Sequence, residues 1–236
     1  INVTGYAGME LARILHQHPE VELISVTGRS AAGKQLGEVL PHLSSVGLTI
    51  TEDRTDSVDL VFSALPHAAS AERLGPLLDE GLKAVDISGD FRLSDVEEYR
   101  EWYQADHPCP EHLEGAIYGL TELNRDDIAS AQLVANPGCY PTASSLALAP
   151  AISARLVKPD LIVDAKSGVS GAGRGKYAYS EVNENVSAYS IGGHRHQPEI
   201  VQTLSRLNGS SDIRLTFTPH LIPMTRGILV TCYAPL

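Results

Sequence analysis

A cysteine stands where a loop runs into a predicted helix. Cys139 lies within the segment Asn136–Thr142, and an apolar helix is expected over 143–152. Pro141 suits a first helical position, because its missing N–H would be unpaired there anyway. The positive end of the helix dipole would then favour the nucleophilic thiolate form of the cysteine. Gly138 permits close backbone approach, so the amide of Cys139 can face a developing oxyanion. We therefore predict a reactive cysteine, although buried free cysteines are usually inert.

Two histidines flank an arginine later in the chain, in the run His194-Arg195-His196. Such a pair also suits a metal, but no second cluster of ligand types with the right spacing accompanies it, so we predict no metal. A cysteine on one loop and a histidine on another is the arrangement that nucleophilic catalysis needs. We predict Cys139, His194 and His196 as catalytic residues and leave open which histidine transfers the proton. Glu199 follows in the next helix, where a carboxylate complements the helix dipole.

Positive charge is gathered at two places that suit an anionic ligand. The segment Ser167–Lys176 holds four glycines, two serines and two basic residues, Arg174 among them. Its amides, hydroxyls and charges favour an oxyanion or a phosphate, and a flexible linker is the alternative. Arg92 follows a predicted strand and can clamp a carboxylate or phosphate bidentately. A structural ion pair with Asp90 or Asp95 is the competing interpretation for this arginine.

The N-terminal residues form a glycine turn ahead of an amphipathic helix that runs to about Gln17. A dinucleotide-binding fold uses such a turn, here Gly5 to Gly8, to place pyrophosphate at the helix N-terminus. Asn2 stands where a first glycine is expected, and asparagine tolerates left-handed backbone geometry. A buried strand is predicted next, over 21–26. A purely structural turn is the alternative.

The residues after that predicted strand indicate which dinucleotide would bind. Enzymes that use NAD tend to place an acidic residue here for the ribose hydroxyls. This chain has Arg29 and Ser30 instead, with Lys34 nearby. The substitution favours a 2′-phosphate, and hence NADP(H), while a solvated basic loop is the alternative.

Further elements alternate along the chain. Strands are expected at the following ranges: 58–66, 84–88, 161–166, 213–218 and 227–232. A helix should follow the first of these through about Glu80, and 97–124 reads as a connecting excursion with one charged helix. The last two strands should be joined by a turn over 219–226. Ligands in open α/β sheets bind at the carboxyl ends of such strands.

Composition limits the class of protein. The chain has 236 residues and a net charge of −11, which argues against a general nucleic-acid surface. No apolar run approaches the roughly 18 residues of a membrane span, so no membrane partner is predicted. Cys109, Cys139 and Cys232 are too widely and unequally spaced for a disulfide framework or a zinc site, and they fit a reducing cytoplasm.

Eight motifs resemble, in order, those of the N-acetyl-gamma-glutamyl-phosphate reductases, which are enzymes of the semialdehyde dehydrogenase family. The aspartate-semialdehyde dehydrogenases share their architecture but differ around the cysteine and histidine motifs. The matching segments cover nearly the whole chain: Gly5–Leu11, Ala31–Lys34, Gly89–Leu93, Tyr118–Leu123, Asn136–Thr142, Ser167–Arg174, His194–Glu199 and Pro219–Gly227.

The resemblance implies an α/β protein with two domains. Residues 1–138 would form a Rossmann-like, doubly wound NADP-binding domain, and residues 139–236 an α+β catalytic and dimerisation domain. Relatives of this kind continue past Leu236 with a segment that returns to the cofactor domain, so we expect truncation at both ends. The resemblance also implies a cytoplasmic homo-oligomer, either a dimer or a tetramer.

The same resemblance implies NADPH-dependent reduction of N-acetylglutamyl 5-phosphate to its semialdehyde, in arginine biosynthesis. Cys139 would form a thioester that hydride reduces, with a histidine as acid/base; in the family this corresponds to His194. Nine positions are predicted to bind the NADP(H) cofactor: Gly5, Tyr6, Gly8, Arg29, Ser30, Leu65, Pro66, Ser170 and Gly171. Four are predicted to bind the small anionic acyl-phosphate substrate: Arg92, Asn136, Arg174 and Arg195.

Three alternatives stay open. A related acyl-phosphate reductase, either aspartate-semialdehyde dehydrogenase-like or acting on carrier-bound amino-adipyl phosphate, would keep the motifs. A hydrolase or acyltransferase would use Cys139 without a nucleotide, and would leave the Gly5 turn and Arg29 without a task. A catalytically silent fragment is the third.

Overall fold

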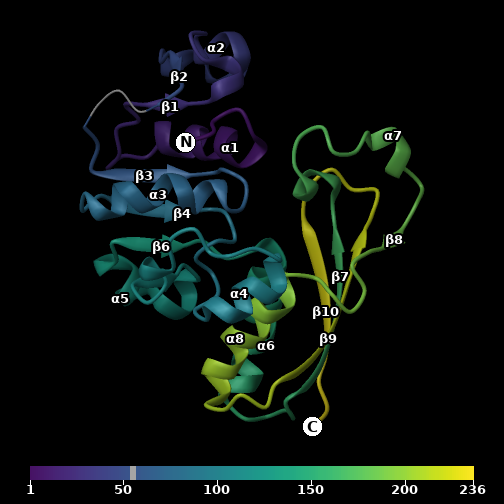
Figure 1. Cartoon of the computed structure of the whole chain (residues 1–236). Coiled ribbons are helices and arrows are strands. Elements are labelled where there is room, and N and C mark those ends of the chain that lie inside the picture. Colours follow the sequence, from purple (N-terminus) through teal and green to yellow (C-terminus); the bar gives the residue numbers. More distant parts are fainter. Residues whose placement is uncertain (54–56) are drawn as a thin grey trace. The chain divides into compact units, whose positions relative to one another are not determined.

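The computed structural model describes residues 1–53 and 57–236, and the chain divides into two compact units (Figure 1). The first unit comprises residues 1–94, 107–119 and 124–136. The second unit comprises residues 95–106, 120–123 and 137–236. The chain therefore passes into the second unit just before the cysteine motif, after two short earlier excursions.

Parallel strands form the framework of the first unit. One sheet has four strands in the order β3-β4-β6-β5, and a separate pair is β1-β2. Parallel register pairs Val61 with Ala84 and Val85 with Val134. The strands are β1 (Val26–Thr27), β2 (Ile50–Thr51), β3 (Leu60–Ser63), β4 (Lys83–Asp86), β5 (Ala116–Tyr118) and β6 (Leu133–Ala135).

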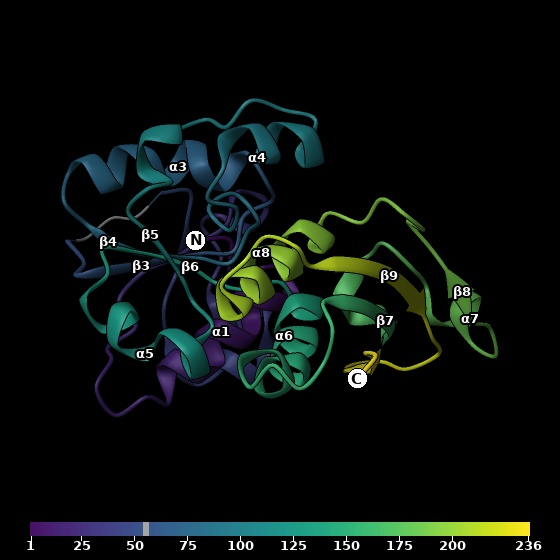
Figure 2. The same ribbon diagram turned by 90° about the horizontal axis from the view of Figure 1, so that it is seen from below.

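Helices lie on both faces of this sheet. In Figure 2, α3 lies on one side of β3, β4 and β6, and α1 and α5 lie on the other. This layering confirms the predicted Rossmann-like arrangement of the first domain. The helices and 3₁₀ turns are α1 (Tyr6–His16), η1 (Arg29–Ala31), α2 (Leu36–Val39), η2 (Pro41–Val46), α3 (Ala69–Asp79), η3 (Pro110–His112) and α5 (Thr121–Ser130). The last has non-helical backbone at Asn124, where the chain re-enters the first unit.

The strand predicted over 21–26 is wrong except at its last residue, because the structure has a strand only at Val26–Thr27. The partner strand β2 is itself two residues long, so the ladder it offers is short. On the other side, Val3 N–H donates to Thr27 O at 2.8 Å, a single bond from the start of the chain. The apolar character of residues 21–26 therefore predicted a longer strand than the neighbouring strands can pair with.

The glycine turn brings α1 against the first residues of the chain. A Cβ placed on Gly8 would lie 2.2 Å from Asn2 O, so only glycine allows this approach. Asn2 has φ 66°, and its Nδ2 donates to Ala64 O at 2.7 Å. The prediction that asparagine would accommodate left-handed geometry here is confirmed.

The second unit is built on a mixed sheet in the order β10-β7-β9-β8. Parallel register pairs Val163 with Phe217, while Val230 pairs with Ala165 in antiparallel fashion. The strands are β7 (Asp160–Ser167), β8 (Ser187–Ala188), β9 (Arg214–Leu221) and β10 (Ile228–Tyr233). The helices and 3₁₀ turn are α4 (Val96–Tyr103), α6 (Cys139–Ser153), η4 (Val169–Ala172), α7 (Tyr179–Val182) and α8 (His196–Asn208).

Helices α6 and α8 pack together and cover one face of this sheet. The buried core between them and the strands consists of Tyr140, Leu148, Ile152, Leu161, Val163, Ala165, Ile200, Leu204, Ile213 and Phe217. On the opposite face several apolar side chains stay exposed, including Ile162 at 48%, Leu229 at 60% and Tyr233 at 56%. The alternation along β7 and β10 thus gives the sheet one packed face and one open face.

Helix α6 begins at Cys139, four residues earlier than predicted. Pro141 is its third residue, not its first, which a helix still accepts because the first four N–H groups have no intrahelical partner. Strand β9 continues to Leu221, so the turn expected over 219–226 is shorter. Among the described residues, no helix is both long and apolar enough to span a membrane.

Candidate active site and cofactor pocket

Cys139 is exposed and is the first residue of α6, with Gly138 as the N-cap. The backbone around this junction is held in place on its helical side. Thr142 donates to Gly138 O at 2.9 Å from both its backbone N–H and its hydroxyl. The thiol therefore lies at the positive end of a 15-residue helix, where a thiolate is stabilised.

A buried carboxylate fixes the residue before the cysteine. Glu199, in the first turn of α8, accepts the N–H of Gly138 through Oε1 at 2.7 Å. The side chain of Glu199 is only 1% exposed. The sequence predicted a helix-dipole role for Glu199, and the structure adds this contact with the cysteine loop. The only sequence signal was its place three residues after His196, which does not indicate the partner.

Both histidines pack around the residue that follows the cysteine. The ring centroids of Tyr140 and His194 are 5.7 Å apart, and those of Tyr140 and His196 are 6.0 Å apart. The two imidazoles lie 4.8 Å from one another. The fold of the second unit therefore gathers the predicted catalytic residues around one buried tyrosine.

The hydrogen bonding of His194 indicates where its proton lies. Nδ1 accepts the backbone N–H of His196 at 3.1 Å, so the neutral ring carries its hydrogen on Nε2. Burial, and then the charge of Arg195, lowers the pKa of His194 to about 4. At neutral pH the ring is therefore an uncharged hydrogen-bond donor.

Two phenols complete the cluster. The hydroxyls of Tyr140 and Tyr189 are 2.9 Å apart, and Tyr140 also donates to His220 O at 3.4 Å. Burial is the main cause that raises the pKa of both tyrosines, so both stay protonated. Neither tyrosine was predicted to have a role, because a tyrosine beside the cysteine carries no signal of its distant partner.

The glycine-rich segment is more ordered than a free anion-binding loop. Two of its amides are engaged with main-chain carbonyls: Val169 N–H donates to Met224 O at 2.8 Å and Ser170 N–H to Thr225 O at 3.0 Å. A Cβ on Gly168 would lie 2.9 Å from Met224 O, so this close approach requires glycine. These two amides are therefore occupied within the fold, whereas Arg174 of the same segment is exposed.

Arg92 is buried and tied to main-chain carbonyls of the first unit. Its Nε donates to Asn136 O and its Nη2 to Ile87 O, each at 2.8 Å. Asp90, one of the ion-pair partners considered for this arginine, accepts the N–H groups of Ala68 and Ala71 at 2.9 Å. Arg92 thus links the residues after β4 to those after β6, and its role toward substrate stays a prediction.

Arg195, also predicted to bind substrate, is exposed. Its guanidinium carbon lies 5.9 Å from the centre of the Tyr103 ring, which allows a cation–π contact within the second unit. Its role toward substrate likewise stays a prediction.

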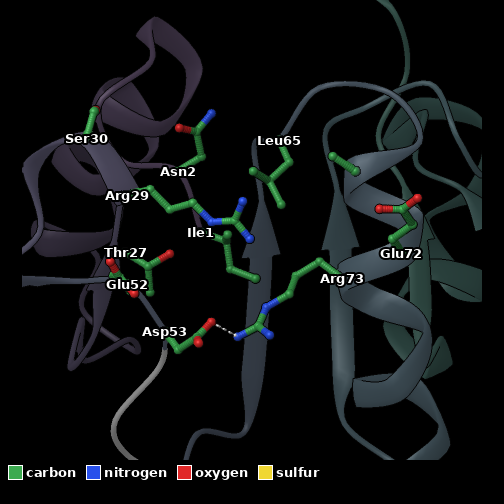
Figure 3. A pocket seen from close by; sticks show the side chains of 12 residues that line it. Ile1, Asn2, Thr27, Arg29, Ser30, Glu52, Asp53, Leu65, Glu72 and Arg73 are labelled. Atoms are coloured by element: carbon green, nitrogen blue, oxygen red, sulfur yellow. Dashed lines mark ion pairs between the residues drawn. The ribbon is translucent and has the colours of Figure 1, made fainter.

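A cavity of about 490 Å³ opens in the first unit, beside the ends of β1 and β2 (Figure 3). Of the predicted cofactor residues, Arg29, Ser30 and Leu65 line it. Gly5, Tyr6 and Pro66 lie outside the lining residues, where the chain turns into α1 and α3. The residues that line the cavity are Ile1, Asn2, Thr27, Gly28, Arg29, Ser30, Glu52, Asp53, Leu65, Ala69, Glu72 and Arg73.

Three carboxylates and a second arginine in this cavity were missed by sequence reasoning. Glu52 and Asp53 follow β2, whose parallel register with β1 places them beside Gly28 and Arg29. Arg73 comes from α3, far away in sequence. The two arginines of this cavity fit a nucleotide with an anionic ribose. Among the described residues, no group of three or more His, Cys, Asp or Glu side chains is placed to hold a metal.

Comparison with known proteins agrees with this geometry. The model of the semialdehyde dehydrogenase NAD binding domain matches residues 1–131. The model of the semialdehyde dehydrogenase dimerisation domain matches residues 139–236.

Solved structures show the fold. Aspartate semialdehyde dehydrogenase II from Vibrio cholerae superposes with a TM-score of 0.70 at 18% identity, covering 99% of this chain and 72% of that one. Aspartate semialdehyde dehydrogenase with NADP from Candida albicans gives a TM-score of 0.67 at 16% identity, covering 99% and 69%.

Curated relatives are much closer in sequence. An N-acetyl-gamma-glutamyl-phosphate reductase of Dehalococcoides mccartyi is 59% identical over 100% of this chain and 70% of its own length. The enzyme of the same name from Pelotomaculum thermopropionicum is 49% identical over the same shares. The chain therefore belongs to the N-acetyl-gamma-glutamyl-phosphate reductases of the semialdehyde dehydrogenase family.

Proposed function

We propose that this chain catalyses the NADPH-dependent reduction of N-acetylglutamyl 5-phosphate to N-acetylglutamate 5-semialdehyde, a step of arginine biosynthesis. One observation carries the proposal most directly. Cys139 is exposed at the first position of α6, and the preceding Gly138 is held by the buried Glu199. Relatives that are 49–59% identical over the whole chain are named for this reaction, which supports the choice of substrate.

Cys139 begins the reaction as a thiolate. It attacks the acyl phosphate, so a C–S bond forms and the C–O bond to the phosphoryl group breaks, releasing inorganic phosphate. NADPH, when bound, supplies the hydride that reduces the resulting thioester carbon. The C–S bond then breaks, the aldehyde leaves and the thiolate of Cys139 is restored.

His194 acts on the carbonyl oxygen. Because Nδ1 is engaged by the backbone of His196, Nε2–H is the group that donates to the developing oxyanion. Its pKa of about 4 keeps the ring uncharged at neutral pH, so His194 acts as a neutral hydrogen-bond donor. His196, the first residue of α8, is the alternative proton donor.

Exposed cations of the second unit bind the negative groups of the substrate. Arg174 and Arg195 are both exposed, and the net charge of −11 elsewhere keeps positive potential local to such sites. This distribution supports a small anionic substrate rather than a nucleic acid.

The open face of the sheet in the second unit pairs with a second copy of the chain. Ile162, Leu229 and Tyr233 are apolar and exposed there, in the region matched by a dimerisation domain. None of Cys109, Cys139 and Cys232 is in a disulfide, which suits a reducing cytoplasm.

The reverse reaction tests the proposal. The chain is given N-acetylglutamate 5-semialdehyde and NADP⁺, with and without inorganic phosphate, and NADPH formation is followed by absorbance. We expect phosphate-dependent NADPH formation that is lost in Cys139→Ala. Ester or amide hydrolysis that needs no nucleotide would favour a hydrolase instead. A preference for a carrier-bound amino-adipyl semialdehyde would show that the chain belongs with the reductases that act on that substrate.

A further inference from the structure

Two guanidinium groups face the cavity of the first unit from different elements. Arg29 extends from η1, and Arg73 extends from the facing helix α3, as Figure 3 shows. Only Arg29 was suggested by the sequence pattern, because it follows the strand after which nucleotide specificity is usually decided. The position of Arg73, 44 residues later, carries no such signal.

Arg73 already holds an anion. Its Nη2 lies 2.5 Å from Oδ1 of Asp53, the acidic residue that follows β2. The side chain of Arg73 is 37% exposed and that of Asp53 is 70% exposed, so the pair lies at the mouth of the cavity and not in the core. Thr51 donates its hydroxyl to the backbone carbonyl of Asp53 at 2.6 Å, which anchors the chain on the acidic side of this pair.

An exposed pair of this kind is easily exchanged. Surface ion pairs contribute little to stability, because both charges remain well solvated. A phosphate monoester carries more charge than a carboxylate and offers three acceptor oxygens, so a guanidinium binds it more strongly and can do so bidentately. The Asp53 carboxylate thus occupies the position that a ligand phosphate would take on Arg73.

We propose that Arg73 is a specificity-determining residue for the 2′-phosphate of the adenosine ribose in NADP(H), and that Asp53 competes with this phosphate for its guanidinium. The inference rests on the proposed use of NADPH and deepens it. The guanidinium groups of Arg29 and Arg73 would bind the phosphate from two sides of the cavity. A ribose without the phosphate gains nothing by displacing Asp53, so Arg73 gives NAD(H) no comparable stabilisation.

Measurements of nucleotide affinity test the role of Arg73 and do not require the chain to catalyse its reaction. Dissociation constants of 2′,5′-ADP and 5′-AMP are measured by calorimetry on the unaltered chain and on Arg73→Gln, Asp53→Asn and the double variant. Arg73→Gln should weaken 2′,5′-ADP binding by about tenfold and leave 5′-AMP within about twofold. Asp53→Asn should strengthen 2′,5′-ADP binding by about threefold, and this gain should vanish when Arg73 is also replaced.

Glu72→Gln is the matched control. Glu72 is exposed, lines the same cavity and precedes Arg73 on the same helix, so its replacement adds the same charge as Asp53→Asn. An equal gain in both variants, or a gain that survives Arg73→Gln, would reduce the effect to general electrostatics and overturn the competition. Equal weakening of both nucleotides in Arg73→Gln would overturn its role in specificity.

Failure of this inference is distinguishable from failure of the proposed function. If the unaltered chain prefers 2′,5′-ADP and Arg73→Gln keeps that preference, Arg73 is excluded while NADP(H) use stands. If the unaltered chain binds both nucleotides equally, the inference is overturned, and the phosphate-dependent reverse reaction still decides the chemistry at Cys139 independently.

Discussion

Cys109 and Cys139 each lie near histidines in the part of the chain that the structure describes, and Cys139 has the properties of a reactive site. Cys109 lies two residues after His107, whose Nδ1 accepts the backbone N–H of the cysteine at 3.1 Å. His194 makes the same local bond to the backbone N–H of His196, also at 3.1 Å. The local hydrogen-bond pattern is therefore shared, and the difference lies in what surrounds it.

At Cys109 every polar group is used within the fold. The thiol is 5% exposed and donates to Ala71 O at 3.5 Å, while His107 Nε2 bonds to Asp90 O at 2.8 Å. Burial, followed by nearby carboxylates, raises the pKa of Cys109 to about 12. Cys139 is instead exposed at a helix N-terminus. A cysteine and a histidine that are close in sequence are therefore not enough to make a reactive site. Exposure and the helix dipole distinguish Cys139 from Cys109.

The largest loss of activity should come from replacing Cys139, with the same replacement at Cys109 as the comparison. Cys139→Ser should lower the rate of the reverse reaction by at least about 1,000-fold, because the hydroxyl is a far weaker nucleophile than a thiolate. The midpoint of thermal unfolding should stay within about two degrees of that of the unaltered chain, since this side chain is exposed. Cys109→Ser is the control and should retain turnover. Full activity in Cys139→Ser would end the distinction between the two cysteines.

Removing the carboxylate behind Cys139 should have the next largest effect. Glu199→Ala leaves a cavity and deprives the Gly138 N–H of its acceptor, so we expect a loss of about 3 kcal/mol in unfolding free energy. Alkylation of Cys139 by iodoacetamide, followed by mass spectrometry, should also slow. Glu199→Gln keeps an acceptor oxygen and should restore most of both properties. Identical alkylation rates in all three proteins would show that Glu199 does not position the cysteine.

The sequence was sufficient to predict elements whose signals are local. The amphipathic pattern before Gln17 predicted α1, and the Gly-Cys-Tyr-Pro run predicted a helix start beside Cys139, although α6 begins earlier than expected. Asn2 was expected to adopt left-handed backbone, and it does. Composition and turn chemistry determine such features because they depend on neighbours in the chain.

Features that depend on distant partners could not be predicted in this way. The strand expected over 21–26 failed because strand length depends on the partner ladder, which is two residues long. The contact between Glu199 and Gly138 joins residues 61 positions apart, and Arg73 reaches the cofactor cavity from a helix whose sequence pattern shows only its apolar face. Periodicity identifies the elements but not which polar side chains meet across them.

A further effect should appear in the pH dependence of stability. His194 is held neutral in the folded chain, with its pKa lowered from 6.5 to about 4. The unfolded chain therefore takes up a proton first, and the free energy of unfolding should fall by about 3 kcal/mol as pH drops from about 6.5 to about 4. His194→Asn, whose amide oxygen can replace Nδ1 as acceptor, should flatten this part of the curve in urea titrations. The exposed His42→Asn serves as control, and an unchanged curve in His194→Asn would contradict the assignment.

The smallest effect concerns the inert cysteine. Cys109→Ala removes one buried sulfur beside Gly75, where an added Cβ would lie 3.4 Å from the Cβ of Cys109. The small cavity should cost about 1 kcal/mol in unfolding free energy, measured by urea titration. Turnover and the alkylation rate of Cys139 should not change, because the thiol of Cys109 is buried and donates to Ala71 O within the first unit. A loss of turnover without a loss of stability would assign Cys109 a chemical role, and the contrast between the two cysteines would then no longer rest on burial.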